Sequence, residues 1–499
     1  MTPNKTITPR GEETPRGYKY DVIVCGGGTS GVAAAISAAR AGAKTLLIEK
    51  LGTLGGQMNV TGPPGFSYAY LYNARGERVV DGLIGETHER LLKEGHARPS
   101  ELNEYRSGSD YIFSFVDPDW WGLLIFQMMV ESDVRLLLHS LVVDVIKNGD
   151  SVHGVVVENA AGRQYFEAKV VIECTGEGDI AVRAGCEYEL LPRNQNEPHT
   201  VCFTLDGINW DETLAYIKAN PDQILPRGDV DRSDDERYEL IRKVKNIEEL
   251  GDMLGFFKIM DEALKNGDWH QFSGMGFFVA PKDDGRILAH CQHSAQVANL
   301  WSCDPWDLSY GEIENRRQIV IAIDTFRKYM PGFQKAYLTK MGVGMRLRDG
   351  RRIMGDYVLG WDDVIEGRRH YDCYGKCTFH AGAVHVADNR TIAPLNQLQK
   401  GMSRGTAGPP NKGTYDLPYR MLVPRKIENL LIAGKHVSAD RCAYQRFLHE
   451  TMMSGQAAGV AAALCMKLGV TPRELEDENY IKQFHEVLKS QRVIIDGVN

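Results

Sequence analysis

Four residues near the start of the chain have the types and spacing needed to hold a dinucleotide. Gly26, Gly28 and Gly31 follow the pattern G-x-G-x-x-G, and Glu49 comes about 20 residues later. Glycines at these places permit a tight turn, let the backbone approach a pyrophosphate, and let a helix pack closely on a strand. An acid at this distance can accept hydrogen bonds from both hydroxyls of an adenosine ribose. The set therefore predicts dinucleotide binding.

The elements that must position these residues follow from the surrounding sequence. Residues 20–25 form a short apolar run typical of a buried strand, and an alanine-rich run after Gly31 predicts a helix that Gly42 ends. Residues 45–50 predict a second buried strand that carries Glu49. A chance glycine-rich turn is the alternative, but strand, glycines, helix, strand and acid occur in the required order. The acid disfavours NADP and leaves FAD and NAD open.

A pair of adjacent glycines helps to distinguish FAD binding from NAD binding. Gly55 and Gly56 follow soon after the acid, and such a pair lets a second backbone segment run beside a large flat cofactor. Simple NAD-binding domains usually continue directly into another helix at this point. The pair therefore favours FAD, with an ordinary glycine turn as the alternative.

A later strand, at residues 169–174, brings further backbone to the same edge of the sheet. It ends in Thr175 and Gly176, and ligands of open α/β sheets bind at the carboxyl ends of the strands. Asp179 then either faces the cofactor or caps the next helix. Short strands between residues 134 and 168 predict an antiparallel meander, in which the backbone of Val142 or Val143 faces the adenine edge. The other cofactor-binding residues that we predict are Thr29, Ser30, Lys50, Gln57, Thr61, Gly434, Gln456, Ala457 and Ala458.

The last predicted strand and helix complete the cofactor site. Residues 427–434 form a buried strand, and an alanine-rich helix is expected to open at Ser454 and Gly455. A helix N-terminus here would point at the pyrimidine ring of a flavin and stabilise the negative charge of its reduced form. The alternative is that Gly455 and Gly459 only permit close helix packing.

The hydrophobic pattern changes from about residue 187 to residue 414, which predicts an inserted substrate or cap domain. We expect polar helices at residues 211–219 and 234–266, a strand pair near residues 274–290 and an amphipathic helix at residues 312–329. Its arginine-rich segment, residues 342–352, suits an anionic substrate. Structural ion pairs under the cap are the alternative.

Composition excludes several other classes of protein. The formal net charge of the 499 residues is −8, which disfavours a nucleic-acid partner. No apolar run approaches the roughly 20 residues that span a bilayer. Scattered cysteines and an N-terminus without a signal-peptide pattern predict a reducing cytoplasm. Cys373, Cys377 and His380 match no complete four-ligand pattern, so we predict no metal, with zinc or an iron–sulfur cluster as the alternative.

With these segments in view, the chain resembles the FAD-dependent oxidoreductase family related to the heterodisulfide-reductase flavoprotein and the glucose-inhibited-division flavoproteins. Flavoproteins of succinate dehydrogenase and fumarate reductase would be more distant relatives. The resemblance covers residues 20–468. It rests on the glycine motifs at residues 26–31 and 55–56, and on residues 174–179, 331–333, 348–355, 415–420, 432–435 and 455–459.

Two places depart from the family pattern. Relatives often carry Arg-Glu-Ser/Thr-Arg-Arg where this chain has residues 348–352, Arg-Asp-Gly-Arg-Arg. Relatives often have an arginine shortly before the last helix, and residues 444–450 look slightly shortened there. No set of cysteines matches the iron–sulfur ligation of the heterodisulfide-reductase flavoprotein.

The residues and the resemblance together predict an α/β fold: a Rossmann-type FAD-binding domain like that of glutathione reductase, with a β-meander insertion and an inserted α+β substrate or cap domain. The expected boundaries are a flexible arm at residues 1–17, a discontinuous FAD-binding domain at residues 18–186 and 415–470, a cap domain at residues 187–414 and a helical tail at residues 471–499.

The leading functional interpretation is a dehydrogenase or reductase that moves a hydride between a small, anionic organic substrate and flavin N5. An electron acceptor or donor of unknown kind would close the cycle. The alternatives are a partner-dependent electron-transfer or RNA-modification subunit, and an FAD monooxygenase. Oligomeric state and covalent attachment of FAD stay open. Candidate catalytic residues are Arg351 and Arg352 as a substrate clamp, and His380, His385, Tyr419 and His436 as acid or base.

Overall fold

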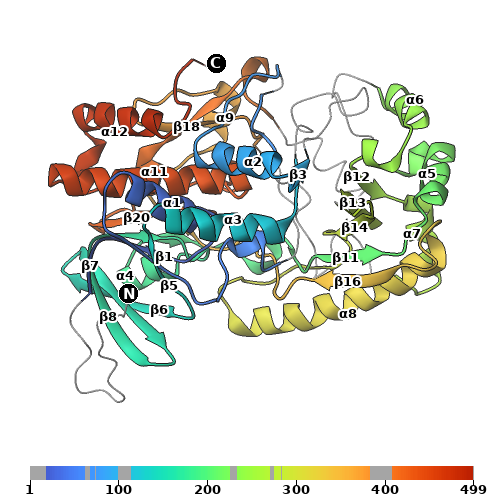
Figure 1. The fold of residues 1–499 in the computed structure, drawn as a ribbon, viewed down its shortest axis with the longest axis horizontal. Coiled ribbons are helices and arrows are strands. Elements are labelled where there is room, and N and C mark those ends of the chain that lie inside the picture. The colour runs from blue at the N-terminus through green and yellow to red at the C-terminus, as the bar shows by residue number, and fades with distance from the viewer. Residues whose placement is uncertain are drawn as a thin grey trace.

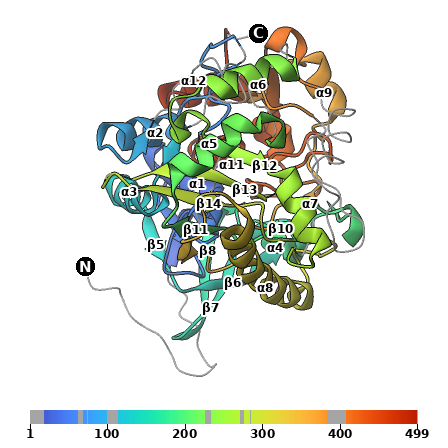
Figure 2. The ribbon, with the colours of Figure 1, turned by 90° about the vertical axis from the view of Figure 1, so that its right-hand side faces the viewer.

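The computed structural model describes residues 18–61, 68–73, 75–98, 114–224, 233–269, 275–282, 284–381 and 407–497. The expected N-terminal arm and His385 lie outside these ranges. Figure 1 shows two sheets side by side, each with its own helices, and Figure 2 turns the second sheet and its helices toward the viewer.

The first sheet is built on parallel strands, as the sequence predicts. Their spatial order is β5 (Arg135–Leu137), β2 (Thr45–Ile48), β1 (Tyr18–Cys25), β8 (Gly162–Glu173) and β20 (Leu430–Ile432). The expected meander is present, because β7 (Ser151–Asn159) and β6 (Leu141–Asn148) add to β8 in antiparallel fashion. Residues 164–168 and 169–174, which we expected as separate strands, belong to the single strand β8. The central strands are buried on both faces, which explains their continuous apolar sequence.

Helices pack on this sheet or on one another beside it (Figure 1). They are α1 (Thr29–Arg40), α2 (Leu83–Lys93), α3 (Pro118–Glu131), α4 (Asp179–Ala184), α9 (Trp361–Glu366), α11 (Leu448–Leu468) and α12 (Glu478–Ser490). Most residues of α1 and α11 are buried, since both helices are rich in alanine and glycine and lie against each other. The α/β, Rossmann-type fold class is confirmed.

The second sheet is antiparallel and has its own core. Its order is β12 (Asp252–Gly255), β13 (Met275–Pro281), β14 (Ile287–Cys291), β11 (Phe203–Asp206) and β16 (Tyr337–Met341). It carries α5 (Trp210–Ala219), α6 (Asp234–Lys243), α7 (Phe257–Lys265) and the long α8 (Pro305–Tyr329). Phe203, Phe277 and Phe326 are fully buried between them.

One sequence expectation in this region was wrong. Residues 234–266 do not form a single helix, because β12 separates α6 from α7. Asn246 caps a short helical turn through its side chain, and Gly251 has φ of +71°, a value that ends helical geometry. Because the sequence of α6 is mostly polar, its hydrophobic periodicity did not indicate where the helix ends.

Four short antiparallel strand pairs of the described structure stand apart from the two sheets. They are β3 (Ala97–Arg98) with β4 (Phe115–Val116), β9 (Tyr188–Glu189) with β17 (Arg352–Ile353), β10 (His199–Thr200) with β15 (Gln296–Val297), and β18 (Cys373–Cys377) with β19 (Tyr415–Pro418). Leu359, Val364 and Cys373 pack in the core of the first sheet, although they lie inside the expected cap range. The domain boundaries therefore stay predictions.

In the described part of the chain, no helix combines the length and the hydropathy that crossing a bilayer requires.

Candidate functional site

The glycine-rich turn between β1 and α1 has the geometry that dinucleotide binding requires. Gly26 has φ of +104°, in the region that favours glycine. A Cβ on Gly31 would lie 1.8 Å from the carbonyl oxygen of Gly26, so only glycine lets α1 start this close to the turn. A Cβ on Gly28 would meet no atom within 4 Å. The backbone at the N-terminus of α1 is therefore open to a ligand, and its N–H groups favour a phosphate.

Glu49 stands directly after β2, beside this turn. It is buried, and its carboxylate accepts the N–H of Gly27 at 2.6 Å and the N–H of Leu51 at 2.9 Å. A carboxylate offers about four acceptor positions, so roughly two are left for ribose hydroxyls. Lys50, by contrast, is exposed.

Val143 lies near Glu49 at the edge of the sheet. The register of β6 shifts between Val142 and Asp144, so Val143 has no opposite residue in the ladder. The N–H of Ser140 donates to the Glu49 carbonyl at 3.0 Å and holds the start of β6 next to the ribose acid. The role of the Val143 backbone at the adenine stays a prediction.

The second glycine pair runs alongside the first turn. The N–H of Gly55 donates to the Gly27 carbonyl at 2.7 Å, and Gly55 and Gly28 form a parallel bridge. A Cβ on Gly56 would lie 2.9 Å from the Gly28 Cα. The next residue, Gln57, contacts a distant segment, because its side-chain amide donates to the Leu347 carbonyl at 2.8 Å. The loop thus connects the nucleotide turn to the second sheet.

Thr61 closes this connection. Its hydroxyl donates to the Gln57 carbonyl at 2.8 Å, and its own carbonyl accepts the N–H of Cys202 at 3.2 Å. A Cβ on Gly342 would lie only 2.3 Å from the same Thr61 carbonyl oxygen. The Gly55–Thr61 region and the start of the arginine-rich segment are therefore in direct contact.

The carboxyl end of β8 is organised by a buried carboxylate that sequence reasoning missed. Glu173 is fully buried and accepts the N–H groups of Thr175 at 2.5 Å, Ile180 at 2.6 Å and Ala181 at 3.2 Å. Burial raises the pKa of Glu173 to about 7. Gly176 has φ of +92°, and a Cβ there would meet no atom within 4 Å. The Thr175-Gly176 backbone is therefore shaped by Glu173 and stays open on its other side.

Other predicted cofactor residues hold the helices against this edge. The Thr29 and Thr451 hydroxyls lie 2.8 Å apart, which links α1 to α11. Gly434 has φ of +111°, and its N–H donates to the Ser454 hydroxyl at 3.1 Å. Ser30 lies beneath it, because a Cβ on Gly434 would meet the Ser30 hydroxyl at 2.7 Å.

The expected start of the last helix was wrong. Helix α11 begins at Leu448, so Gly455, Gln456, Ala457 and Ala458 lie inside it and offer no free N–H groups.

The two glycines of α11 instead permit close packing against α1. A Cβ on Gly455 would lie 2.1 Å from the Ser30 carbonyl oxygen, and a Cβ on Gly459 would lie 2.2 Å from the Ala34 carbonyl oxygen. The Gln456 amide oxygen accepts the N–H of Leu83 at the start of α2. Gly455 and Gly459 therefore fit the alternative interpretation, in which they only permit close packing of the helices.

Two of the candidate catalytic residues, Arg351 and Arg352, form structural ion pairs. The Arg351 guanidinium donates to Asp179 at 3.0 Å. Arg352 is buried and donates to Asp349 at 2.9 Å and to Glu189 at 3.1 Å. This pairing argues against a substrate clamp made of these two arginines.

The remaining acid–base candidates differ in burial. Tyr419 is fully buried and its hydroxyl donates to the Pro472 carbonyl at 2.8 Å, which argues against a role with substrate. His436 is fully buried 3.7 Å from Glu173, and burial lowers the pKa of its imidazole to about 3. His380 is half-buried, and its ring lies 4.5 Å from the ring of Phe379.

Cys377 lies in a buried cluster with His449 and Glu450. Its Sγ lies 3.8 Å from His449 Nε2 and 3.7 Å from Glu450 Oε1. The three ligand atoms are close enough together to hold one metal ion, whereas Cys373 and His380 are not part of this cluster. The prediction of no metal site stays a prediction.

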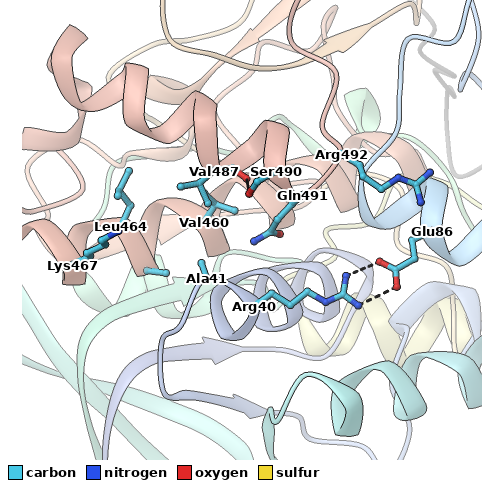
Figure 3. A pocket seen from close by; sticks show the side chains of 11 residues that line it. Arg40, Ala41, Glu86, Val460, Leu464, Lys467, Val487, Ser490, Gln491 and Arg492 are labelled. Atoms are coloured by element: carbon cyan, nitrogen blue, oxygen red, sulfur yellow. Dashed lines mark hydrogen bonds and ion pairs between the residues drawn. The ribbon is translucent and has the colours of Figure 1, made fainter.

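A surface pocket lies elsewhere on the molecule. It has a volume of about 440 Å³ and is lined by residues that include Arg40, Ala41, Val460 and Gln491 (Figure 3). It lies at the C-terminal end of α1, which is about 18 Å from the glycine turn along the helix axis. Its edge carries the ion pair of Arg40 with Glu86. This pocket is therefore separate from the nucleotide turn.

Comparison with known proteins now identifies the family. The FAD dependent oxidoreductase family matches residues 21–488, nearly the whole chain. The chain belongs to this family. Among proteins with curated descriptions, none matches this FAD dependent oxidoreductase.

Solved structures similar to this FAD dependent oxidoreductase share little sequence with it. A geranylgeranyl bacteriochlorophyll reductase-like protein from Thermoplasma acidophilum is 14% identical, over 96% of this chain and 84% of that chain, with a TM-score of 0.45. A myxobacterial chondrochloren halogenase is 12% identical over 95% and 80%, also with a TM-score of 0.45. Aquifex aeolicus GidA is 14% identical over 91% and 64%, with a TM-score of 0.43. We draw no functional conclusion from these likenesses.

The cofactor of this FAD dependent oxidoreductase is FAD, and the residues of the turn fit it. The open backbone at Gly28 suits the pyrophosphate, Glu49 keeps acceptor positions for the ribose, and the Gly55–Gly56 pair leads away from the turn toward the second sheet. The flavin would therefore lie between the Gln57 loop and the cap.

Sequence reasoning indicated the arginine-rich segment, but it missed that two arginines of this segment group with Arg446 at that place. Arg346 and Arg348 come from the segment after β16, and Arg446 directly precedes α11. Residues two apart in an extended segment share a side, so the spacing of Arg346 and Arg348 was a signal that could have been used. Glu197 and His199 complete the cluster.

Proposed function

We propose that this FAD dependent oxidoreductase transfers a hydride between a small organic substrate and flavin N5, at the junction of the two sheets. Bound FAD supplies the two-electron chemistry, and an external electron acceptor or donor closes the cycle. The observation that carries the proposal is the bond from Gln57 to the Leu347 carbonyl, which joins the nucleotide turn to the arginine-bearing segment.

His380 is our acid–base candidate, since a proton usually moves with the hydride. It is half-buried, and its neighbour Phe379 packs on Phe447 at the start of α11, with 4.5 Å between the ring centroids. His380 therefore lies close to the helix terminus beside Arg446. Its partial exposure leaves it able to exchange a proton, unlike His436 and Tyr419.

An anaerobic screen tests the proposal. Small organic compounds are mixed with the oxidised holoenzyme, and flavin bleaching is followed, with reoxidation by candidate acceptors as the reverse assay. We expect bleaching by a restricted class of compounds. If no compound bleaches the flavin until a partner protein is added, the proposal fails in favour of a partner-dependent subunit. Oxygen uptake coupled to hydroxylation would favour a monooxygenase.

The role of His380 is tested in the same assay. The variant His380→Asn should have a turnover lower by about 10²-fold or more, with unchanged FAD content. The matched control is His153→Asn on the exposed side of β7, which should turn over normally. Full turnover by His380→Asn would remove His380 from the mechanism.

A further inference from the structure

Two arginines beside the Gln57 loop, the buried Arg348 and the half-buried Arg346, have no carboxylate of their own. The N–H of Arg346 donates to the Thr200 carbonyl at 2.6 Å, and the N–H of Arg348 donates to His199 Nδ1 at 3.3 Å. Both arginines therefore sit against β10, on either side of the Leu347 carbonyl that Gln57 holds. This places their guanidinium groups where the first and second sheets meet.

The charges in this cluster do not balance. The Arg346 guanidinium donates to the Gln292 amide at 3.1 Å, and that of Arg348 lies 3.4 Å from His293 Nδ1, so both partners are side chains without a formal negative charge. The nearby Arg446 forms an ion pair with Glu197 at 3.0 Å. Within the described residues, these three arginines therefore face a single ion-paired carboxylate.

Other buried cations of this chain are paired differently. Arg352 has Asp349 at 2.9 Å, and Lys376 has Asp416 at 2.7 Å. An unpaired buried cation is strongly unfavourable, since desolvation is not compensated. Burial and the neighbouring arginines accordingly lower the pKa of Arg348 to about 9. Arg346 and Arg348 thus differ from Arg352 and Lys376, because neither has a carboxylate partner.

Hydrogen-bond donors in the cluster also lack acceptors. Because His199 Nδ1 accepts the N–H of Arg348, the proton of this neutral imidazole is on Nε2. In the described structure, neither His199 Nε2 nor Arg348 Nε has a hydrogen-bond partner, although His199 is fully buried and Arg348 is 4% exposed. Buried donors without acceptors are rare and unfavourable. An anionic acceptor would satisfy both donors and balance the charges of Arg346 and Arg348.

We propose that Arg346, Arg348 and the Nε2–H of His199 form a subsite for the carboxylate of the substrate, which is an organic acid. The planar guanidinium fork matches a carboxylate in bidentate geometry. The proposal rests on the proposed function, because it assigns the substrate class of that same junction. An anion of tetrahedral shape, and the flavin ring itself, are the competing occupants that the experiment separates.

The test titrates the holoenzyme with acetate, succinate and benzoate at constant ionic strength. Acetamide, succinamide and benzamide serve as neutral isosteres, and sodium chloride and inorganic phosphate serve as other anions. Binding is followed by the flavin absorbance and, independently of the flavin, by calorimetry. We expect saturable binding of at least one carboxylate and none of its amide.

Variants locate the bound carboxylate. Arg346→Gln and Arg348→Gln should each weaken carboxylate binding by about tenfold or more and keep a full complement of FAD. The matched control is Arg317→Gln, which removes an exposed ion pair with Glu314 on α8 and should bind the carboxylate as the wild type does. Binding to wild-type protein is informative even if one variant does not fold.

Three results would overturn the inference: no carboxylate binds, phosphate binds more tightly than every carboxylate, or Arg348→Gln folds as the wild type does but loses its FAD. Failure of the proposed function looks different. In that case the calorimetry still reports carboxylate binding at the arginines, while no compound bleaches the flavin.

Discussion

At the scale of single residues, the Glu49 carboxylate holds part of the fold and is our predicted acceptor for the ribose of the cofactor. It holds the N–H groups of Gly27 and Leu51 while keeping acceptor positions for the ribose. Sequence spacing was enough to predict it. Glu173 is the contrasting case, because nothing in the apolar strand that ends in it indicates that its carboxylate organises the following turn.

Glu49→Gln should weaken FAD binding by about tenfold to 10²-fold, because a charged acceptor of ribose hydroxyls is lost and an amide N–H₂ faces Gly27. The measurement is the quenching of FAD fluorescence on titration of apoprotein. Glu262→Gln, on the exposed face of α7, is the matched control. Equal affinity of Glu49→Gln and wild type would contradict the assignment.

The raised pKa of Glu173 predicts a pH dependence of stability. Its pKa is about 7 when folded and about 4.5 when unfolded, so the folded state binds the proton more tightly. Its contribution to the free energy of unfolding is therefore complete below pH 4.5 and declines as pH rises to 7. Between pH 5 and 8 the stability difference between wild type and Glu173→Gln should fall by about 2 to 3 kcal/mol.

Urea unfolding at the two pH values, with FAD saturating, measures this difference. A constant difference, or one that grows with pH, would show that the Glu173 carboxylate is ionised in the folded protein near pH 5.

At the scale of elements, strands and helices with clear periodicity were predictable, and helix starts were not. Helix α11 begins after Phe447, a residue with no capping side chain, and Glu450 supplies the cap by accepting the N–H groups of Arg446 and Phe447 at 2.6 and 2.8 Å. Ser454 lies six residues after Leu448, the first residue of α11, and the Ser454-Gly455 pair has residue types that are common at helix starts. The sequence pattern therefore predicted the start at the wrong place.

Gly455→Ala should destabilise the protein by about 2 kcal/mol, because its Cβ would lie 2.1 Å from the Ser30 carbonyl and force α1 away from α11. FAD affinity should fall with it, since α1 carries the phosphate-binding turn. Thermal unfolding gives the first quantity. Gly408→Ala is the control, because a Cβ there meets nothing within 4 Å. Unchanged stability of Gly455→Ala would show that the helices can separate freely.

At the scale of the whole molecule, the site is assembled from segments far apart in the chain. Arg348, Arg446 and His199 come from three places that only the packing of the two sheets brings together, so their grouping could not be predicted from sequence. The sequence did indicate an arginine-rich segment facing an anion, but it singled out Arg351 and Arg352. The structure pairs those two with carboxylates of this chain.

Gly342→Ala should lower turnover by about tenfold or more while FAD stays bound, because its Cβ would meet the Thr61 backbone at 2.3 Å and shift the cap relative to the cofactor loop. Gly344→Ala is the control in the same loop, where the nearest atom would lie 3.5 Å away. Steady-state kinetics with FAD content measured in parallel tests this. Equal turnover by both variants would mean that this contact does not position the site.

The most direct test of the central claim is the absorbance spectrum of the purified protein, before and after acid precipitation. The fold, the glycine turn and the family predict the bands of oxidised flavin, with one FAD per chain released to the supernatant. Absence of flavin, even after FAD is added back to the protein, would contradict the account.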